Sequence, residues 1–226
     1  MSHLINIFLE PGKVFAELKH KPTFLVPALL VAVPMALAAL LYFLNVDADW
    51  WAHQQIQAMG ADMSTAEIEQ VSKIMPGARA MTWITAPMVL LTVAIMYIML
   101  AFYYWLAGKV TGNLLSYRQG LSLSAWSGMP MVIGAVIAMI AVYISSPQSS
   151  FESMQLLNID PLFVQLTTDH DWSRLAKSFS LLNFWVWFLA ALGWKTWFST
   201  GWGQALAVVL LPQVLIYGGM ALFALV

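Results

Sequence analysis

The chain has 226 residues, of which 61% are hydrophobic and only 9% are charged. A soluble globular domain carries about a quarter charged residues, so this composition excludes a soluble fold and predicts that the bilayer is the solvent. The net charge of −1 argues against a nucleic-acid partner, and the absence of cysteine excludes disulfides and thiolate metal sites.

Residues 1–22 are the first predicted element, a cytoplasmic amphipathic segment. Apolar side chains recur at helical spacing on both sides of Pro11-Gly12, at Leu4, Ile5, Phe8, Val14, Phe15 and Leu18. This pattern predicts a broken amphipathic helix that lies in the membrane interface. Its simplest role is to anchor the first span, and the alternative is that it docks a partner or senses lipid.

Five apolar segments follow, and none of them contains Asp, Glu, Lys, Arg or His. They cover residues 23–44, 83–107, 121–144, 178–194 and 204–226. A helix needs roughly 20 apolar residues to cross the hydrocarbon core. We therefore predict an all-α polytopic membrane protein with about five transmembrane helices, plus short interfacial and extracytoplasmic helices, in one domain over residues 1–226. The segment at 178–194 is the shortest, and a re-entrant or interfacial helix is the alternative there.

Two long loops lie on the same predicted side of the membrane, at residues 45–82 and 145–177. In the first, Ser64-Thr65-Ala66-Glu67 has the form of a capping box and predicts a short helix after it. In the second, Asp160-Pro161 has the form of a helix start, with proline in the first turn. We expect the two loops to pack together as a small cap.

The basic residues predict the orientation. With a cytoplasmic N-terminus, the inner segments hold six of the ten Lys and Arg residues and the outer loops hold four. Because cytoplasmic loops carry an excess of Lys and Arg, we expect the N-terminus inside and the C-terminus outside.

Small residues in the third span favour close helix packing, at Ser124-x-x-x-Gly128 and Gly134-x-x-x-Ala138. Gly218-Gly219 lies late in the last span. The pattern fits contacts within the bundle or contacts in a dimer.

A polar turn between the second and third spans is the candidate functional site. It contains Lys109, Gly112, Asn113, Ser116, Tyr117, Arg118 and Gln119. Two cations around a tight turn suit a lipid phosphate or a partner's carboxylate. The simpler interpretation, which we favour, is a solvated basic loop that sets the topology.

No catalytic, cofactor-binding or metal-binding residues are predicted, because the chain lacks H-E-x-x-H, G-x-S-x-G and P-loop motifs. Asp169, His170 and Asp171 are a weak candidate for a divalent metal, and exposed loop charge is the better explanation. We expect a non-enzymatic protein whose partners are the lipid bilayer and either a membrane protein or a second copy. The alternative is a transporter or channel for a small solute or lipid.

The sequence resembles the Yip1 domain family in three segments. The first is Phe8-Leu9-Glu10-Pro11-Gly12-Lys13-Val14-Phe15, with Pro22 before the first span. The second runs from Gly108 to Pro130 and contains Ser116-Tyr117-Arg118-Gln119 and Ala125-Trp126-Ser127. The third runs from Gly201 to Pro212, where Gln204-Ala205 opens the last helix.

This resemblance implies a five-span membrane protein with a cytoplasmic N-terminus and supplies no catalytic residues. Eukaryotic members have longer cytoplasmic N-terminal regions and act in vesicle trafficking with small GTPases. The 22 residues before the first span here fit the short bacterial type, which implies a multi-pass protein of the bacterial inner (plasma) membrane.

Overall fold

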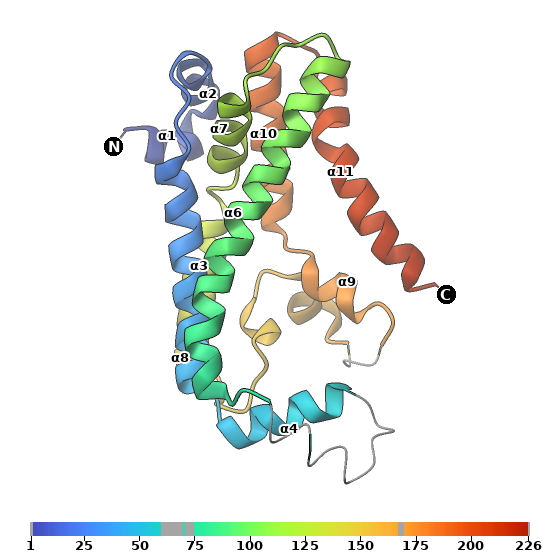
Figure 1. The fold of residues 1–226 in the computed structure, drawn as a ribbon. Helices are drawn as coiled ribbons and strands as arrows, with labels where there is room; N and C mark the ends of the chain where they lie inside the picture. The colour runs from blue at the N-terminus through green and yellow to red at the C-terminus, as the bar shows by residue number, and fades with distance from the viewer. Residues whose placement is uncertain (1, 60–69, 71–74, 167–169, 226) are drawn as a thin grey trace.

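The computed structural model describes residues 2–59, 70, 75–166 and 170–225. In those ranges the fold is helical, apart from an isolated antiparallel bridge between Asn158 and Ser180. The helices are α1 (Ser2–Leu9), α2 (Pro11–His20), α3 (Leu25–Asn45), α4 (Ala48–Met59), α6 (Ala78–Val110), α7 (Tyr117–Ser127), α8 (Met131–Ile144), η1 (Glu152–Met154), η2 (Asp160–Val164), α9 (Ser173–Ser178), α10 (Leu182–Phe198) and α11 (Trp202–Phe223). The long helices stand together, with α1 and α2 at one end and α4 at the other (Figure 1). The predicted all-α class is confirmed.

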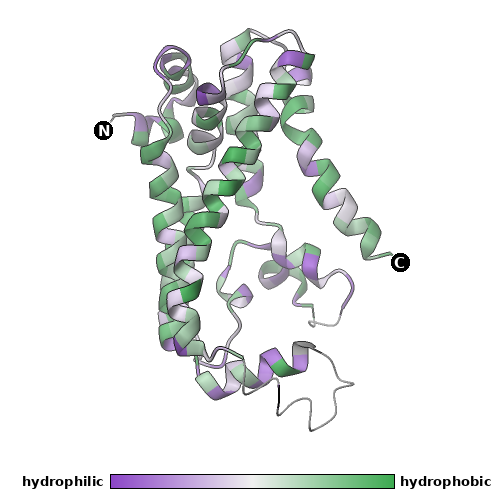
Figure 2. Cartoon of the chain, in the orientation of Figure 1, coloured by the Kyte–Doolittle hydropathy of each residue, from purple (hydrophilic) through white to green (hydrophobic). Residues whose placement is uncertain are grey.

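Three of the described helices, α3, α6 and α11, are long and apolar enough to cross a membrane. A fourth span results if α7 and α8 are counted as one bent helix. α10 has 17 residues, somewhat fewer than the roughly 20 that a full crossing needs. The prediction of about five spans is compatible with this set and slightly exceeds it. Hydrophobic residues dominate the shafts of the long helices (Figure 2).

The third predicted span, 121–144, is not one continuous helix. It is divided into α7 and α8, which are bent by 43° at a break between Ser127 and Met131. Pro130 lies in that break and has no N–H to donate to the preceding turn. α7 also begins earlier than predicted, at Tyr117.

The fourth predicted span, 178–194, begins four residues too early. α10 starts at Leu182 and continues to Phe198, past Lys195. Residues 178–181 are not part of α10 because they pair with another segment. The N–H of Leu181 donates to Leu157 O over 2.9 Å, and the N–H of Ile159 donates to Phe179 O over 2.9 Å. This pairing with a segment distant in sequence therefore shifts the start of α10 to Leu182.

The second predicted span, 83–107, lies inside the longer helix α6. Its 33 residues correspond to about 50 Å of helix, which exceeds a hydrocarbon core of about 30 Å. Arg79 and Lys109 lie near its two ends. Long basic side chains at such positions reach toward the interface, so the apolar middle alone needs to cross.

The predicted amphipathic segment is a helical hairpin whose break falls at Glu10, one residue before the predicted Pro11-Gly12, which form the first turn of α2. Its apolar face is packed into the main hydrophobic cluster of the protein. Ile7, Val14, Phe15 and Leu18 are buried with Leu123 of α7 and Trp194 of α10. The hairpin is thus a part of the bundle core, which goes beyond the interfacial helix that the sequence predicts.

The described parts of the two long loops pack together. Trp51 of α4 and Met154 of η1 share a cluster with Tyr42 of α3 and Val142 of α8. The backbone N–H of Asp47 also donates to Pro147 O over 2.9 Å. The predicted start at Asp160-Pro161 is confirmed as a short π-helix, η2. α4 is not predicted from the sequence, and the helix expected after Ser64 falls largely outside the described residues.

The small residues of the third span make contacts within the chain. A Cβ on Gly128 would lie 2.7 Å from the Tyr97 hydroxyl oxygen, and one on Gly134 would lie 3.0 Å from Leu182 Cδ1. Gly120 is closer still to a neighbouring backbone, with 2.8 Å to Ala101 O. These glycines therefore serve packing inside the bundle.

Candidate functional site

The predicted polar turn connects α6 to α7 through a closed helix terminus. The N–H of Asn113 donates to Gly108 O over 2.8 Å and the N–H of Gly112 donates to Lys109 O over 3.5 Å, which is the hydrogen-bond pattern of a Schellman motif. Gly112 has φ of 71°, a left-handed conformation that favours glycine. Gly112 and Asn113 therefore end α6.

The following residues start α7. Ser116 and Gln119 form a capping box, in which the Gln119 N–H donates to Ser116 Oγ over 3.2 Å and the Ser116 N–H donates to Gln119 Oε1 over 2.9 Å. The Gln119 amide also donates to Lys19 O of α2 over 2.9 Å. The Tyr117 hydroxyl donates to Ile98 O over 3.1 Å. Ser116 and Gln119 thus cap α7, and Gln119 and Tyr117 fix it against α2 and α6.

The two cations of the turn are held differently. Lys109 Nζ lies 3.7 Å from the centroid of the Trp105 ring, a cation–π contact. Arg118 is exposed, and neither cation forms an ion pair with any described residue. These two side chains are the ones that a lipid phosphate or a partner's carboxylate would contact, and that role stays a hypothesis.

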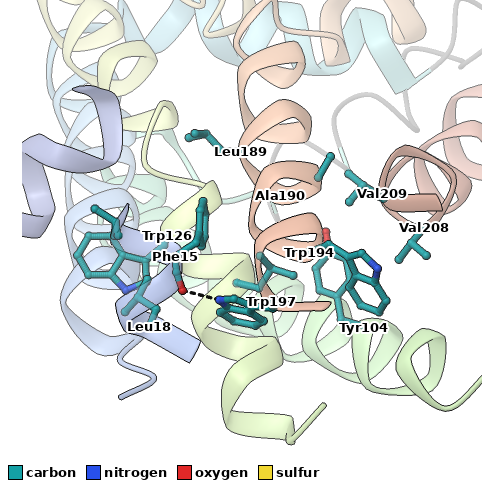
Figure 3. Packing of buried hydrophobic residues seen from close by; sticks show 14 of the residues in the cluster. Phe15, Leu18, Tyr104, Trp126, Leu189, Ala190, Trp194, Trp197, Val208 and Val209 are labelled. Atoms are coloured by element: carbon teal, nitrogen blue, oxygen red, sulfur yellow. Dashed lines mark hydrogen bonds between the residues drawn. The ribbon is translucent and has the colours of Figure 1, made fainter. Parts of the chain in front are cut away.

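The amino-terminal hairpin is held next to the turn by hydrogen bonds, one of which is drawn in Figure 3. Trp197 Nε1 of α10 donates to Phe15 O of α2 over 2.6 Å, and Lys19 Nζ donates to Trp197 O. Trp126 Nε1 of α7 donates to Thr23 O over 2.8 Å. Each indole N–H thereby obtains a hydrogen-bond acceptor in an apolar setting. The apolar stripe of this segment was evident in the sequence, whereas these tryptophan anchors were not.

His170 and Asp171 lie at the surface, between Asp169, which is outside the described residues, and α9. The Trp172 N–H donates to His170 Nδ1 over 3.2 Å, so that nitrogen already accepts a hydrogen bond. His170, Asp171 and Arg174 line a hollow of about 320 Å³ together with Met220 and Phe223 of α11. In the described part of the chain, no group of three His, Cys, Asp or Glu side chains is placed to hold a metal ion.

The second half of α11 has no fully buried residue among those that the structure describes, and it contacts the bundle through Tyr217, whose hydroxyl accepts a hydrogen bond from Asn183 Nδ2 over 3.0 Å. The buried residues of α11, Ala205, Val208 and Val209, all precede Pro212. Toward its C-terminus α11 leans away from the other long helices (Figure 1). Gln213 is half-buried in the middle of α11, and its amide makes no hydrogen bond to any residue that the structure describes. A Cβ on Gly218 or Gly219 would meet nothing within 4 Å.

Comparison with known proteins identifies the chain at the family level. A model of the Yip1 domain matches residues 5–225. Membrane protein YknW of Bacillus subtilis (strain 168) is 22% identical over 223 residues, covering 98% of this chain and 88% of the relative. No solved structure matches the chain. Because the family model extends over nearly the whole sequence, this membrane protein belongs to the Yip1 domain family.

Proposed function

We propose that this protein acts without catalysis, by assembling with another membrane protein through the second half of α11. The observation that carries the proposal is the pair Gly218 and Gly219, at which a Cβ would meet no described atom within 4 Å. The fitting occupant is a transmembrane helix of a partner protein or of a second copy.

Gln213 supports the assembly through its amide, at a second contact on the side of α11 opposite Gly218 and Gly219. An amide in hydrocarbon without a hydrogen-bond partner is costly, because no water is present to solvate it. A neighbouring helix with a polar side chain would satisfy it, and such interhelical bonds contribute about 0.6–2 kcal/mol.

The glycine pair supports the proposal through shape. Each glycine in a helix costs about 1 kcal/mol relative to alanine, and no close contact with the described residues explains either one. Small residues allow two membrane helices to approach until their backbones touch. A helix seated on Gly218 and Gly219 would give them that role.

The proposal includes a location. The apolar helices require a bilayer, and we place the protein in a bacterial inner membrane with its N-terminus cytoplasmic and its C-terminus extracytoplasmic. We likewise propose that residues 1–226 form one membrane domain and that the polar turn has a function.

Purification in a mild detergent tests the assembly. The wild-type chain is expected to elute with a stoichiometric partner or as a homo-oligomer, and replacing both Gly218 and Gly219 by leucine is expected to reduce it to a single chain. Gly203→Leu is the matched control, since it is on the same helix and also faces open space. A wild-type monomer that crosslinks to no partner would rule the proposal out.

The alternative is a transporter or channel for a small solute or lipid. It is favoured by a cavity of about 230 Å³ beside the middle of α3. Liposomes containing the purified protein would then show solute flux or lipid scrambling above empty liposomes. Rates equal to those of empty liposomes across a broad panel would exclude this alternative.

A further inference from the structure

The cavity beside α3 lies at the centre of the bundle along the helix axes. Its lining includes Met35, which is the middle residue of α3 (Leu25–Asn45), and Ala135 and Ala138 of α8. The opposite wall comes from the segment that precedes α10 and from its first turn. If α3 crosses the membrane, the cavity lies near the bilayer midplane.

The polar groups of the cavity all come from these segments, beside Phe151, Leu157 and Leu182. Gln155, Asn158 and Asn183 contribute amides, and Ser178 and Ser180 contribute hydroxyls. Non-helical backbone is tolerated at membrane depth only where protein buries it or where it lines a cavity. A polar segment placed here is therefore typical of a ligand site.

Two of these amides have hydrogen-bonding capacity left over. Asn158 Nδ2 donates to Gln155 Oε1 over 2.8 Å and to Lys177 O over 2.6 Å, which uses both amide hydrogens and fixes a side chain that is 5% exposed. Asn158 Oδ1 and Gln155 Nε2 make no hydrogen bond to any described residue. One acceptor and one donor are thus available side by side.

The lining selects against charge. None of the residues that line the cavity has a side chain that ionises near neutral pH. Burying an unpaired charge there would be costly, whereas a hydroxyl or an ester could bond to the free amide groups. The volume of about 230 Å³ is below the roughly 300–1,000 Å³ of a complete small-molecule pocket, so it suits the head of a larger molecule.

From these features we infer that the cavity binds the uncharged, hydroxyl- and ester-bearing head of a glycerolipid, with its acyl chains extending into the bilayer. The free amide groups of Gln155 and Asn158 bond to the head, and the alanines of α8 contact its apolar part. The cavity is lined by other residues than the α11 surface proposed for assembly, although Asn183 of the cavity donates to the Tyr217 hydroxyl of α11 over 3.0 Å. It also names a ligand for the transport alternative without requiring transport.

Photo-crosslinking tests the inference directly. Purified full-length protein is reconstituted in liposomes with a diazirine-bearing diacylglycerol, or with the same diazirine on a phosphatidylcholine. The diacylglycerol is expected to label residues 131–138 and 151–183 about tenfold more than the phosphatidylcholine does. Equal labelling by both probes, spread over the lipid-facing helices, would overturn the inference.

Variants sharpen the test. Ala138→Leu fills the cavity and is expected to lower diacylglycerol labelling about tenfold. Val136→Leu is the control, because Val136 is on the same helix but 42% exposed, whereas Ala138 is 5% exposed. Ala138→Val is a smaller second change if the leucine variant does not fold. Wild-type labelling in a folded Ala138 variant would contradict the inference.

A competition arm separates lipid from solute. Water-soluble glycerol in excess presents the same hydroxyls without acyl chains. Labelling that persists in glycerol supports a lipid site, whereas loss of labelling would assign the cavity to a small neutral solute and overturn the lipid inference. Failure here leaves the detergent-mass result for α11 unaffected, so the two proposals can fail separately.

Discussion

Pro212 leaves a backbone carbonyl of α11 without its helical hydrogen-bond donor, and a residue distant in sequence supplies another donor. A proline has no N–H, so Val208 O, four residues earlier in α11, loses its helical donor. The Tyr103 hydroxyl of α6 donates to that carbonyl instead, over 2.5 Å. This bond joins α6 to α11 at the last buried turn of α11.

Tyr103→Phe is expected to destabilise the protein by about 1–3 kcal/mol, because it leaves a partly buried carbonyl without a donor. Thermal unfolding in detergent measures the change. Tyr143→Phe is the control, since Tyr143 is 67% exposed. Equal unfolding midpoints for the two variants would show that the bond contributes little.

The Asp47 side chain accepts hydrogen bonds from backbone N–H groups at the start of α4. Its Oδ1 accepts the N–H groups of Asp49 over 3.0 Å and Trp50 over 2.9 Å. The hydrogen bond from the Trp50 N–H lowers the pKa of the Asp47 carboxyl below its ordinary value. The charged form is therefore favoured in the folded state.

The stabilisation from Asp47 is expected to be complete above its unfolded pKa of about 4 and to disappear as the pH falls through the lowered folded value. Asp47→Ala should thus lower the unfolding midpoint at pH 7, and the difference from wild type should shrink in strong acid. Asp49→Ala is the comparison, because the Asp49 side chain lies in the same helix turn and makes no capping hydrogen bond. A difference that grows in acid would contradict the prediction.

At the scale of helices, the crossing of α6 and α7 depends on the absence of a side chain. A Cβ at Gly120 would lie 2.8 Å from Ala101 O and 3.1 Å from Ala101 Cα. Backbone atoms cannot move aside as the end of a side chain can. The two helices therefore approach closely only because position 120 is glycine.

Gly120→Ala is expected to cost about 1–3 kcal/mol through this clash, although alanine normally favours a helix. Gly12→Ala in α2, where a Cβ would meet nothing within 4 Å, is expected to be neutral or stabilising by up to about 1 kcal/mol. Opposite signs in unfolding experiments would support the packing argument. Two stabilised variants would refute it.

The helical hairpin α1–α2 behaves as a part of the core. Phe15 is fully buried, and its ring contacts the Trp197 ring edge to face with 6.4 Å between centroids. A Cβ on Gly193 would lie 2.9 Å from Phe15 Cδ1. The ring can pack against α10 at this place because glycine has no side chain.

Phe15→Ala is expected to destabilise the protein by about 3–5 kcal/mol, the usual cost of removing a buried phenylalanine ring. Limited proteolysis should then cut within α2. Leu9→Ala, at a position that is 72% exposed, is the control. If α2 instead lay free in the interface, the two changes would have similar small effects.

For the whole molecule, the expected topology follows from the distribution of Lys and Arg. A reporter fused before α1 is expected to read cytoplasmic, and one fused after α11 is expected to read extracytoplasmic. The structure places α1 and α2 at one end and directs the C-terminus toward the end that carries α4 (Figure 1). Two reporters on the same side would disprove this arrangement.

Helix positions were predicted well where the cause is local. The span at 23–44 corresponds to α3 within two residues, and the break near Pro11 separates α1 from α2. The start of α10 was misplaced because residues 178–181 pair with residues 157–159. A pairing partner twenty residues away leaves no mark in the hydropathy of a segment.

The candidate site was predicted less well. The polar turn was found from its composition, and the structure shows that five of its seven residues cap or fasten helices. Asn183 and Gln213 are polar residues within apolar segments of the sequence, whereas Gln155 and Asn158 lie in a loop of ordinary polarity. They became notable only when the fold placed them beside the middle of α3.

The sequence by itself determined the bilayer environment, the helical class and the approximate helix positions, because these follow from hydrophobicity, charge and proline along the chain. The tertiary structure alone decided which helices cover one another. It placed α2 in the core, directed the end of α11 away from the other long helices and brought amides to a cavity. Those outcomes depend on contacts between residues far apart in sequence, which local patterns do not specify.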